Sequence, residues 1–381
     1  MAKVITIRSA DQLREHANAW DELWWSSCVS APAARAELIA QWLDTFLGKE
    51  DVRILAVELD GRLVAALPLL LGNKKGLFGV GTLPRSDWTG CGDLLLRPDV
   101  DAQLALVPLV AELQNLDCSL LWLDGVSVEA GYWQTFCRFL REAGLNTLCD
   151  VRYEVGIVGM HHDWEAYRKT WSRMHRRNMK RHARQLQQQG DLQLRVYSEL
   201  ADDDVAPLIE RGFAVEDRSW KGRAGSSVLS SGVNLDYVKR QSMQLNAWKQ
   251  LELVFLELDG KPIAFEWGWT AKGVYHATKV GYDESYAKWG PGQVLRYLMY
   301  EQFFADDIHT SIDFIGDLTP ATGKWCTRTY PVGRIVVGKP TVSGRALMLG
   351  YRAVRQVRDR GRTAAIVDTG QGTGLHEPAP V

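Results

Sequence analysis

Hydrophobic and polar positions along the chain follow two patterns, one typical of strands and one typical of amphipathic helices. The clearest strand-like segment is RILAVELDGRLVAALPL (residues 53–69), in which Asp60-Gly61 separates two apolar runs. Asp-Gly between β-rich runs predicts a tight hairpin. The segment LELVFLELDGKPIAFEW (residues 251–267) repeats the pattern with Asp259-Gly260 at its turn. The repeat predicts two domains of similar build.

Similar elements follow each hairpin. In the first half the pattern predicts helices over residues 102–116 and 132–143, the latter ended by Gly144, and a buried strand over 120–123. In the second half it predicts helices over 164–189, 204–215, 235–248 and 293–304, with strands over 274–280 and 311–315. We therefore expect an α/β protein of the mixed-sheet (α+β) kind, with tandem domains over residues 1–150 and 151–340. A basic helix over 340–362 and a disordered tail over 368–381 should follow within the last segment, 341–381.

Composition narrows the function classes. The 381 residues carry a net charge of −1 and a pI near 6.7, so no overall field indicates a nucleic-acid or membrane binder. The N-terminus has no apolar signal region, and the longest apolar run near it, residues 63–71, is too short to span a bilayer. The six cysteines show no C-x-x-C spacing and accompany no histidine cluster. We therefore expect a cytoplasmic protein with reduced core thiols and no metal.

The segment KVGYDESYAKWGPGQVLRYLMYEQFF (residues 279–304) is the most informative for function. A strand should end near Tyr282, and the loop 288–292 should open a helix at about Gln293. Backbone N–H groups at such a glycine-bearing helix start, together with the helix dipole, can hold a phosphate. Lys288 adds positive charge. The same glycines also fit an ordinary tight turn, so the segment alone leaves both interpretations open.

A resemblance to a known family rests on several segments taken together. They are residues 174–190 (MHRRNMKRHARQLQQQG), 219–226, 256–265, 279–292 and 312–328 in the second half, and 41–43 with 63–70 in the first. The chain resembles GNAT-superfamily acyltransferases of the cellulose-biosynthesis (CelD-like) type, which are distant relatives of the Fem aminoacyltransferases. The resemblance covers residues 35–340. Many relatives read G-D-x-x-Y-K where this chain has Gly316-Asp317 followed by Leu318-Thr319-Pro320, so no acceptor-binding role is transferred to that loop.

The resemblance implies a tandem GNAT fold and an acyl-CoA donor such as acetyl-CoA. The donor diphosphate would lie at the loop and helix start, and the thioester carbonyl would bind a backbone N–H of the preceding strand. The residues so implied in donor binding are Lys279, Val280, Gly281, Lys288, Trp289, Gly290, Gly292 and Gln293. Because the thioester is already activated, the transfer needs neither a metal nor a covalent enzyme intermediate.

Transfer to an amine or hydroxyl also needs a general base. The candidates are polar residues near the predicted cleft, namely Glu216, Asp217, Glu266, His276, Asp313 and Asp317. Asp313 and Asp317 end a predicted strand, Glu216 and Asp217 should lie on a loop, and Glu266 and His276 occupy adjacent hairpin strands. Each carboxylate is equally explained as a solvated or capping group, and His276 as a hydrogen-bonded core residue. The sequence does not select among them.

Two basic clusters bear on the substrates. Trp220, Lys221 and Arg223 could hold a carboxylate or phosphate of the acceptor, or simply anchor a loop. Residues 168–184 form a basic helical segment with no acidic residue, and Tyr167, Trp171 and Met174 should be its apolar stripe. That segment fits a solvated face, a site for an anionic ligand, or a transfer-RNA surface. A second basic stretch follows over residues 352–362.

Three functions remain open from the sequence. The first is acyl transfer from acyl-CoA to a small-molecule or saccharide acceptor by the second domain. Its partner domain would be non-catalytic, because the glycine-rich segment 74–82 is not clearly followed by a helix. The second is transfer from aminoacyl-tRNA on the same fold, and the third is a non-catalytic scaffold.

Phe265, Trp267 and Trp269 should share one strand face and belong to the core. The oligomeric state is not indicated.

Overall fold

A computed structural model describes residues 2–74, 78–86 and 89–369. Of the disordered tail predicted over 368–381, residues 370–381 lie outside the described residues. The N-terminal half contains, in chain order, β1 (Lys3–Ile7), α1 (Ala10–Glu15), α2 (Ala17–Ser26), η1 (Pro32–Ala34), α3 (Ala36–Phe46), β2 (Asp51–Val52), β3 (Ile54–Leu59), β4 (Arg62–Leu67), β5 (Leu70–Lys74), β6 (Phe78–Thr82), β7 (Leu95–Leu96), α4 (Ala102–Asn115), β8 (Leu120–Ser127), α5 (Gly131–Glu142) and β9 (Asn146–Gly159).

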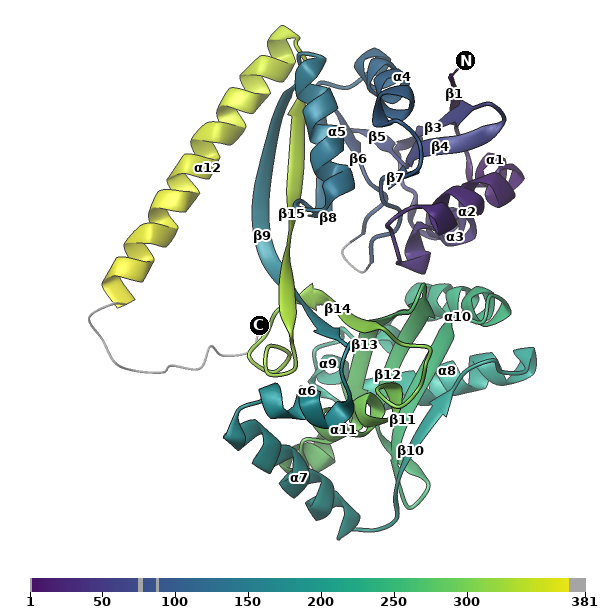
Figure 1. The fold of residues 1–381 in the computed structure, drawn as a ribbon, viewed down its shortest axis with the longest axis vertical. Coiled ribbons are helices and arrows are strands. Elements are labelled where there is room, and N and C mark those ends of the chain that lie inside the picture. The colour runs from purple at the N-terminus through teal and green to yellow at the C-terminus, as the bar shows by residue number, and fades with distance from the viewer. Residues whose placement is uncertain (1, 75–77, 87–88, 370–381) are drawn as a thin grey trace.

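The C-terminal half contains α6 (Trp164–Thr170), α7 (Arg173–Gln187), β10 (Leu192–Tyr197), α8 (Asp202–Asp217), α9 (Trp220–Arg223), η2 (Val228–Ser230), α10 (Gly232–Ala247), β11 (Leu251–Leu258), β12 (Lys261–Ala271), β13 (Val274–Tyr282), η3 (Glu284–Trp289), α11 (Pro291–Phe303), β14 (Ser311–Asp317), β15 (Arg328–Gly338) and α12 (Val342–Thr369). α12 lies along one side of the molecule and starts where β15 ends (Figure 1).

Both predicted hairpins are present and have the same turn. Asp60 and Gly61 join β3 to β4 with φ of 52° and 78°, and Asp259 and Gly260 join β11 to β12 with φ of 50° and 76°. Positive φ at both central residues is the backbone that Asp-Gly hairpins favour. The internal repeat is therefore structural as well as sequential.

The two halves share a sheet. One sheet has the order β1-β3-β4-β7, and the other runs β10-β11-β12-β13-β14-β9-β15-β8-β6-β5-β2. β9 and β15 pass side by side from one half to the other (Figure 1). β9 runs through residue 150, where the sequence analysis placed a domain boundary, and β15 pairs with β8 of the N-terminal half. The halves are thus joined by exchanged strands.

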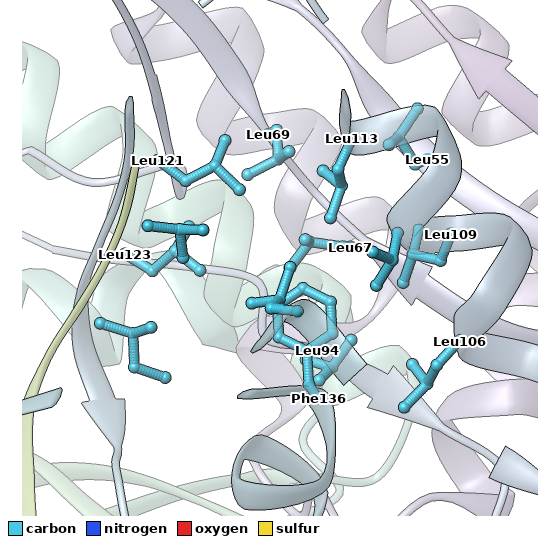
Figure 2. Close-up of a cluster of buried hydrophobic side chains, with 14 of the residues drawn as sticks. Leu55, Leu67, Leu69, Leu94, Leu106, Leu109, Leu113, Leu121, Leu123 and Phe136 are labelled. Carbon is cyan, nitrogen blue, oxygen red and sulfur yellow. The ribbon is translucent and has the colours of Figure 1, made fainter. Parts of the chain in front are cut away.

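Each half buries its own apolar side chains. In the N-terminal half, leucines of β3, β4, β8 and α4 meet Phe136 of α5 (Figure 2). In the C-terminal half, Phe265, Trp267 and Trp269 on one face of β12 pack with residues of α8 and α10, as predicted for a core face. The opposite face of that sheet packs against α11. Both faces of β12 are therefore covered.

Two expected elements differ in detail. The long helix predicted over 164–189 is two helices, because Ser172 accepts a hydrogen bond from the backbone of His175 and caps α7. Met174, expected in the apolar stripe, is 64% exposed, and the buried side of α7 is formed instead by His175, Met179, Ala183 and Leu186. The strand expected over 63–71 is broken near Pro68, which cannot donate a backbone hydrogen bond.

A lysine fastens the C-terminal half to the N-terminal half. Lys272 lies in the turn after β12, and its Nζ donates to the backbone carbonyls of Trp24, Ser27 (2.9 Å) and Val29 (2.7 Å). Burial lowers the Lys272 pKa to about 8, so the group is still charged at neutral pH. One side chain therefore satisfies several carbonyls beyond the end of α2.

We expect Lys272→Met to lower the free energy of unfolding by about 2 kcal/mol, because buried carbonyls lose a charged donor. Lys249→Met is a matched control, since both lysines have positive φ, 51° at Lys272 and 58° at Lys249, whereas Lys249 is exposed. Urea unfolding of both variants measures the difference. Equal unfolding midpoints for the two would show that the contacts of Lys272 do not hold the halves together.

A buried histidine, His309, lies between two carboxylates near the turn that contains Lys272. His309 Nε2 is 2.9 Å from Glu252 Oε1, and its Nδ1 is 2.9 Å from Asp306 Oδ2. Burial alone would lower the pKa of His309, but hydrogen bonds and charges from both carboxylates outweigh it and raise the pKa. The resulting stabilisation is complete below pH ~6.5, the unfolded value, and is lost as pH rises through the folded value.

Wild-type protein should consequently lose stability as the pH is raised from neutral toward 9, and His309→Gln should flatten that slope. His162→Gln, a change of an exposed residue, should leave the slope in place. Urea midpoints recorded at each pH unit provide the test. A slope that persists unchanged in His309→Gln would contradict the assignment.

Candidate active site

The central feature is a pair of parallel strands that separate. β13 and β14 pair only through Val274–Ser311, Tyr275–Ile312 and His276–Asp313. Beyond His276, β13 remains paired with β12 up to Tyr282, whereas β14 follows β9 after a register shift between Asp313 and Asp317. The edge of β13 that faced β14 is therefore free of strand pairing over residues 277–282. Backbone groups on this edge can bind a ligand chain.

The helix that follows this edge has an open N-terminus. Gly290 is the cap residue of α11, with a left-handed φ of 60°, and no side chain caps the helix. Pro291 opens the first turn, which contains no acidic residue. A Cβ added at Gly292 would contact only Tyr282, at 3.7 Å, so the space above the turn is open. The prediction of a helix start at this loop is confirmed, with the helix beginning two residues before Gln293.

Gln293, also predicted in this site, is tied to the next loop. Its Oε1 accepts a hydrogen bond from Trp325 Nε1 at 2.9 Å, and Trp325 is fully buried. The exposed Lys288 places its Nζ 4.0 Å from the centre of the Trp289 ring. These contacts bring one cation and one amide side chain to the start of α11.

The basic helix α7 lies beside this helix start. It packs against α11 and against η3, which contains Trp289. The exposed basic side chains of α7 form no ion pair with any residue that the structure describes; they are Arg173, Arg177, Lys180, Arg181 and Arg184. Their positive charge is therefore unneutralised by protein near the open end of α11. That favours an anionic ligand over a purely solvated face.

A buried ion pair lies against the other side of β13. Glu216 is 2% exposed in the last turn of α8, and its carboxylate accepts from Lys221 Nζ (2.7 Å) and the Val228 backbone (3.1 Å). Lys221 Nζ also donates to the Val280 carbonyl of β13 at 3.0 Å. Gly281 makes the approach possible, because a Cβ there would come 2.6 Å from the Glu216 Cα. Lys221 therefore lies directly on the strand predicted to bind the thioester.

Residues 173–321 match the family model described as an acetyltransferase (GNAT) domain. This segment is a GNAT acyltransferase domain. It contains the separating strands, the open helix start and the Glu216–Lys221 pair. The expectation of a transferase is confirmed, because the chain carries an acetyltransferase domain.

Solved structures resemble the chain over most of its length. FemX aligns at 13% identity over 88% of this chain and 96% of its own, with a TM-score of 0.55. The C-terminal domain of a putative lysylphosphatidylglycerol synthetase from Agrobacterium fabrum aligns at 12% over 88% and 95%, with a TM-score of 0.52. A conserved protein of unknown function from Bacteroides thetaiotaomicron aligns at 10% over 88% and 100%, with a TM-score of 0.55. These likenesses support the expected mixed α/β fold.

No curated protein matches the chain. Among the described residues, no helix combines the length and apolarity needed to cross a bilayer. Those residues also contain no group of three or more His, Cys, Asp or Glu side chains placed to bind a metal ion.

Glu266, one of the predicted base candidates, lies in the interior of the GNAT domain. It is fully buried, and its carboxylate accepts from Arg296 Nε (3.1 Å) and the Tyr275 hydroxyl (3.2 Å). Arg296 belongs to α11, so this ion pair fixes the helix to the sheet. The Glu266 carboxylate therefore has two side-chain hydrogen-bond partners and no exposed surface.

His276 lies on the opposite face of the sheet from Glu266. Its cross-strand partner is Trp269, three positions after Glu266 on β12, and cross-strand partners share a face while successive residues alternate between faces. The ring is 2% exposed, and burial lowers its pKa to about 4 despite a hydrogen bond with the Ser30 backbone. It is therefore neutral and a weak base at neutral pH. Of the two interpretations of His276, a core residue at the junction of the halves fits this burial better than a general base.

Asp313, another of the predicted base candidates, is the neighbour of His276 on β14. Its carboxylate accepts from the Tyr330 hydroxyl (2.9 Å) and the Ile315 backbone (2.8 Å), and burial raises its pKa. Ile315 has a φ of 57°, a strained value for a β-branched residue, where β14 departs from regular pairing. Asp317 ends the same strand and is exposed.

The residues expected on the acceptor side of the GNAT domain are distributed over α8 and α9. Trp220 is 46% exposed, whereas Arg223 is paired with Glu284. Asp217, exposed like Trp220, accepts from the Ser227 hydroxyl at 2.6 Å. Glu216 and Asp217 belong to the last turn of α8, so the prediction that they lie on a loop is wrong. Trp220 and Lys221 remain the members of this cluster available to a substrate.

The sequence analysis missed a polar seam between the halves. Asp93 accepts from the Tyr132 hydroxyl (3.0 Å) and Trp133 Nε1 (2.9 Å), and burial raises its pKa to about 6. Burial and the Asp313 carboxylate raise the pKa of Tyr330, and the charge of Asp93 adds to that shift. The seam therefore acts on the Asp313–Tyr330 pair through its charge. Its residues come from distant segments, and no local motif marks them.

Proposed function

We propose that the GNAT domain transfers an acyl group from acyl-CoA, with acetyl-CoA as the simplest donor, to an amine or hydroxyl of a small molecule or saccharide. The observation that carries the proposal is the separation of β13 from β14 beside the uncapped start of α11. The free edge at residues 279–281 would hold the pantetheine and thioester. The N–H group of Gly292 and the dipole of α11, with Lys288 and Trp289 at the rim, would hold the diphosphate, since the N–H groups of Gly290 and Gln293 already donate to the carbonyls of Ala287 and Gly290.

Lys221 supplies positive charge at the point of transfer in this proposal. When the acceptor attacks the thioester carbonyl, negative charge develops on that oxygen, and a backbone N–H of β13 and the nearby Lys221 ammonium stabilise it. The contact with Glu216 directs the Lys221 Nζ at the Val280 carbonyl. Burial lowers the pKa of the neighbouring Lys279, with Glu216 opposing and Lys221 reinforcing the shift.

Asp313 is the proposed base among the predicted candidates. Its raised pKa lies closer to the working pH than that of an ordinary carboxylate, which suits proton acceptance from the attacking group. Tyr330 orients it through a hydrogen bond. Glu266 and His276 act instead as residues that hold the domain together.

The N-terminal half is proposed to be non-catalytic. In that half β6 pairs with β8 from Val80–Leu120 to Thr82–Trp122. The edge of β8 is therefore covered by a strand, whereas β13 and β14 of the C-terminal half separate after three residue pairs. Asp101 caps α4 by accepting from the Gln103 backbone. A carboxylate already bound at that helix start disfavours a phosphate there.

A second candidate donor is aminoacyl-tRNA. The unpaired basic face of α7 favours it, and FemX, whose fold is similar, belongs by name to the Fem proteins that the sequence resembles. Native mass spectrometry after incubation with a panel of CoA thioesters and total tRNA tests both donors. We expect a complex with one CoA thioester. Binding of tRNA alone, together with activity that ribonuclease abolishes, would replace the CoA proposal, and binding of neither would favour a scaffold.

A further inference from the structure

Two cysteines face each other between α5 and β9, far from the site described above. Cys137 Sγ and Cys149 Sγ are 3.9 Å apart. Cys137 is 2% exposed in the apolar core, whereas Cys149 is half-buried. Disulfide-bonded cysteines have Cβ atoms ~3.8 Å apart, so sulfurs already in contact need a change of side-chain rotamer more than a movement of the backbone.

The surroundings of the two sulfurs are unequal. The hydrogen bond from the Cys137 thiol lowers the pKa of Cys149, burial opposes this, and the guanidinium groups of Arg141 and Arg355 lower it further, to about 7. The Cys137 pKa is raised. Arg355 comes from α12, where its Nη1 also donates to the Cys149 carbonyl at 3.1 Å. Cys149 is therefore the more acidic thiol of the pair, and Cys137 is the less acidic thiol beside it.

We propose that Cys137 and Cys149 are a redox-active pair that a hydroperoxide converts to an intramolecular disulfide. The Cys149 thiolate attacks one peroxide oxygen, the O–O bond breaks, and the departing oxygen takes up a proton to leave an alcohol or water. Cys149 is then a sulfenic acid. The Cys137 sulfur attacks it, the S–S bond forms, and the sulfenic oxygen leaves as water with the Cys137 proton. Two thiols are oxidised and one hydroperoxide is reduced.

The bond would act on a strand that both halves use. β9 carries Cys149 near its start and continues into the C-terminal half, where it pairs with β14. A disulfide would fix α5 to this strand and remove the negative charge that faces Arg355. We therefore expect the oxidised protein to unfold at a higher urea concentration than the reduced protein.

The test uses the full-length protein and hydrogen peroxide. After stoichiometric peroxide, peptide mapping should show Cys137 linked to Cys149, with a mass loss of about 2 Da that a thiol reductant reverses. Cys137→Ala should instead accumulate a sulfenic acid on Cys149 that dimedone traps, and Cys149→Ser should give neither product. Arg141→Gln, a change of an exposed residue, should slow oxidation several-fold at pH 7.

Cys28 provides the matched control, since it is exposed and has no sulfur partner among the described residues. Cys28→Ser should leave the linkage and its rate unchanged. The proposal is overturned if both Cys137 and Cys149 remain open to alkylation after peroxide treatment. It is equally overturned if the recovered disulfide joins other cysteines, or if Cys137→Ala traps no sulfenic acid.

Discussion

Replacing Gly292 by glutamate should weaken binding of acetyl-CoA and of coenzyme A at least ~100-fold, about 2.7 kcal/mol. The new carboxylate would lie in the first turn of α11, where the donor diphosphate is proposed to bind, and would repel it. The fold should survive, because a Cβ at this position meets only Tyr282 at an ordinary contact distance. An acidic group in a first helical turn is itself favourable to the helix by ~0.3–1 kcal/mol.

Gly131→Glu is the matched control for this variant. Gly131 opens α5 in the N-terminal half, also at a helix start, with no atom near an added Cβ. It introduces the same charge into the same kind of helical position in the half proposed to be non-catalytic. Calorimetric titration should give wild-type affinity for Gly131→Glu and an affinity at least ~100-fold weaker for Gly292→Glu. Equal affinity of the two variants would remove the donor site from α11.

Lys221→Met should lower kcat ~100-fold while the donor dissociation constant stays within about threefold of wild type, a loss typical of removing one group that stabilises an oxyanion. Lys239→Met is the control, because Lys239 forms an ion pair with Glu210 and its side chain is 25% exposed, as is that of Lys221. It should change kcat less than twofold, as expected for a peripheral ion pair.

Glu216 would remain buried and unpaired in Lys221→Met, and breaking a buried pair destabilises proteins by ~3–5 kcal/mol. The double variant Glu216→Gln/Lys221→Met removes both charges and separates stability from catalysis. It should regain stability without regaining kcat. A double variant with restored kcat would make Lys221 a purely structural residue.

The sequence was informative where the determining interactions are local. Both Asp-Gly turns, the end of β13 at Tyr282 and the start of α11 depend on turn residues and glycine backbone freedom within a few positions. Such preferences act over short segments, so the pattern alone places them within two residues. The donor loop could be predicted from the sequence for this reason.

The roles of the base candidates depend on partners far along the chain. Glu266 was taken for a cleft residue because its partner Arg296 lies on α11, 30 positions away. Simple alternation also fails on β13. The pairing of β12 with β13 shifts between Trp267 and Gly268 of β12, so Trp267 lies opposite Lys279 while Gly268 lies opposite Ala277. Asp313 could be proposed from its place at a strand end, but its partner Tyr330 lies on a strand that the sequence analysis did not predict.

The strands β9 and β15 escaped prediction for a related reason. Each passes through two environments, so its polar and apolar residues follow no single alternation. Burial along β9 changes from half-buried to fully buried as the strand enters the C-terminal half. A pattern search within one domain cannot detect an element that belongs to both.

The exchanged strands also limit how the enzyme can move. A hinge between the halves would have to bend or shear a continuous hydrogen-bonded ladder that joins β8, β15, β9 and β14. Rigid-body opening about such a hinge is therefore unfavourable. The turns around η2 and after β14 lie outside that ladder, so a shift of either turn would leave the connection between the halves intact.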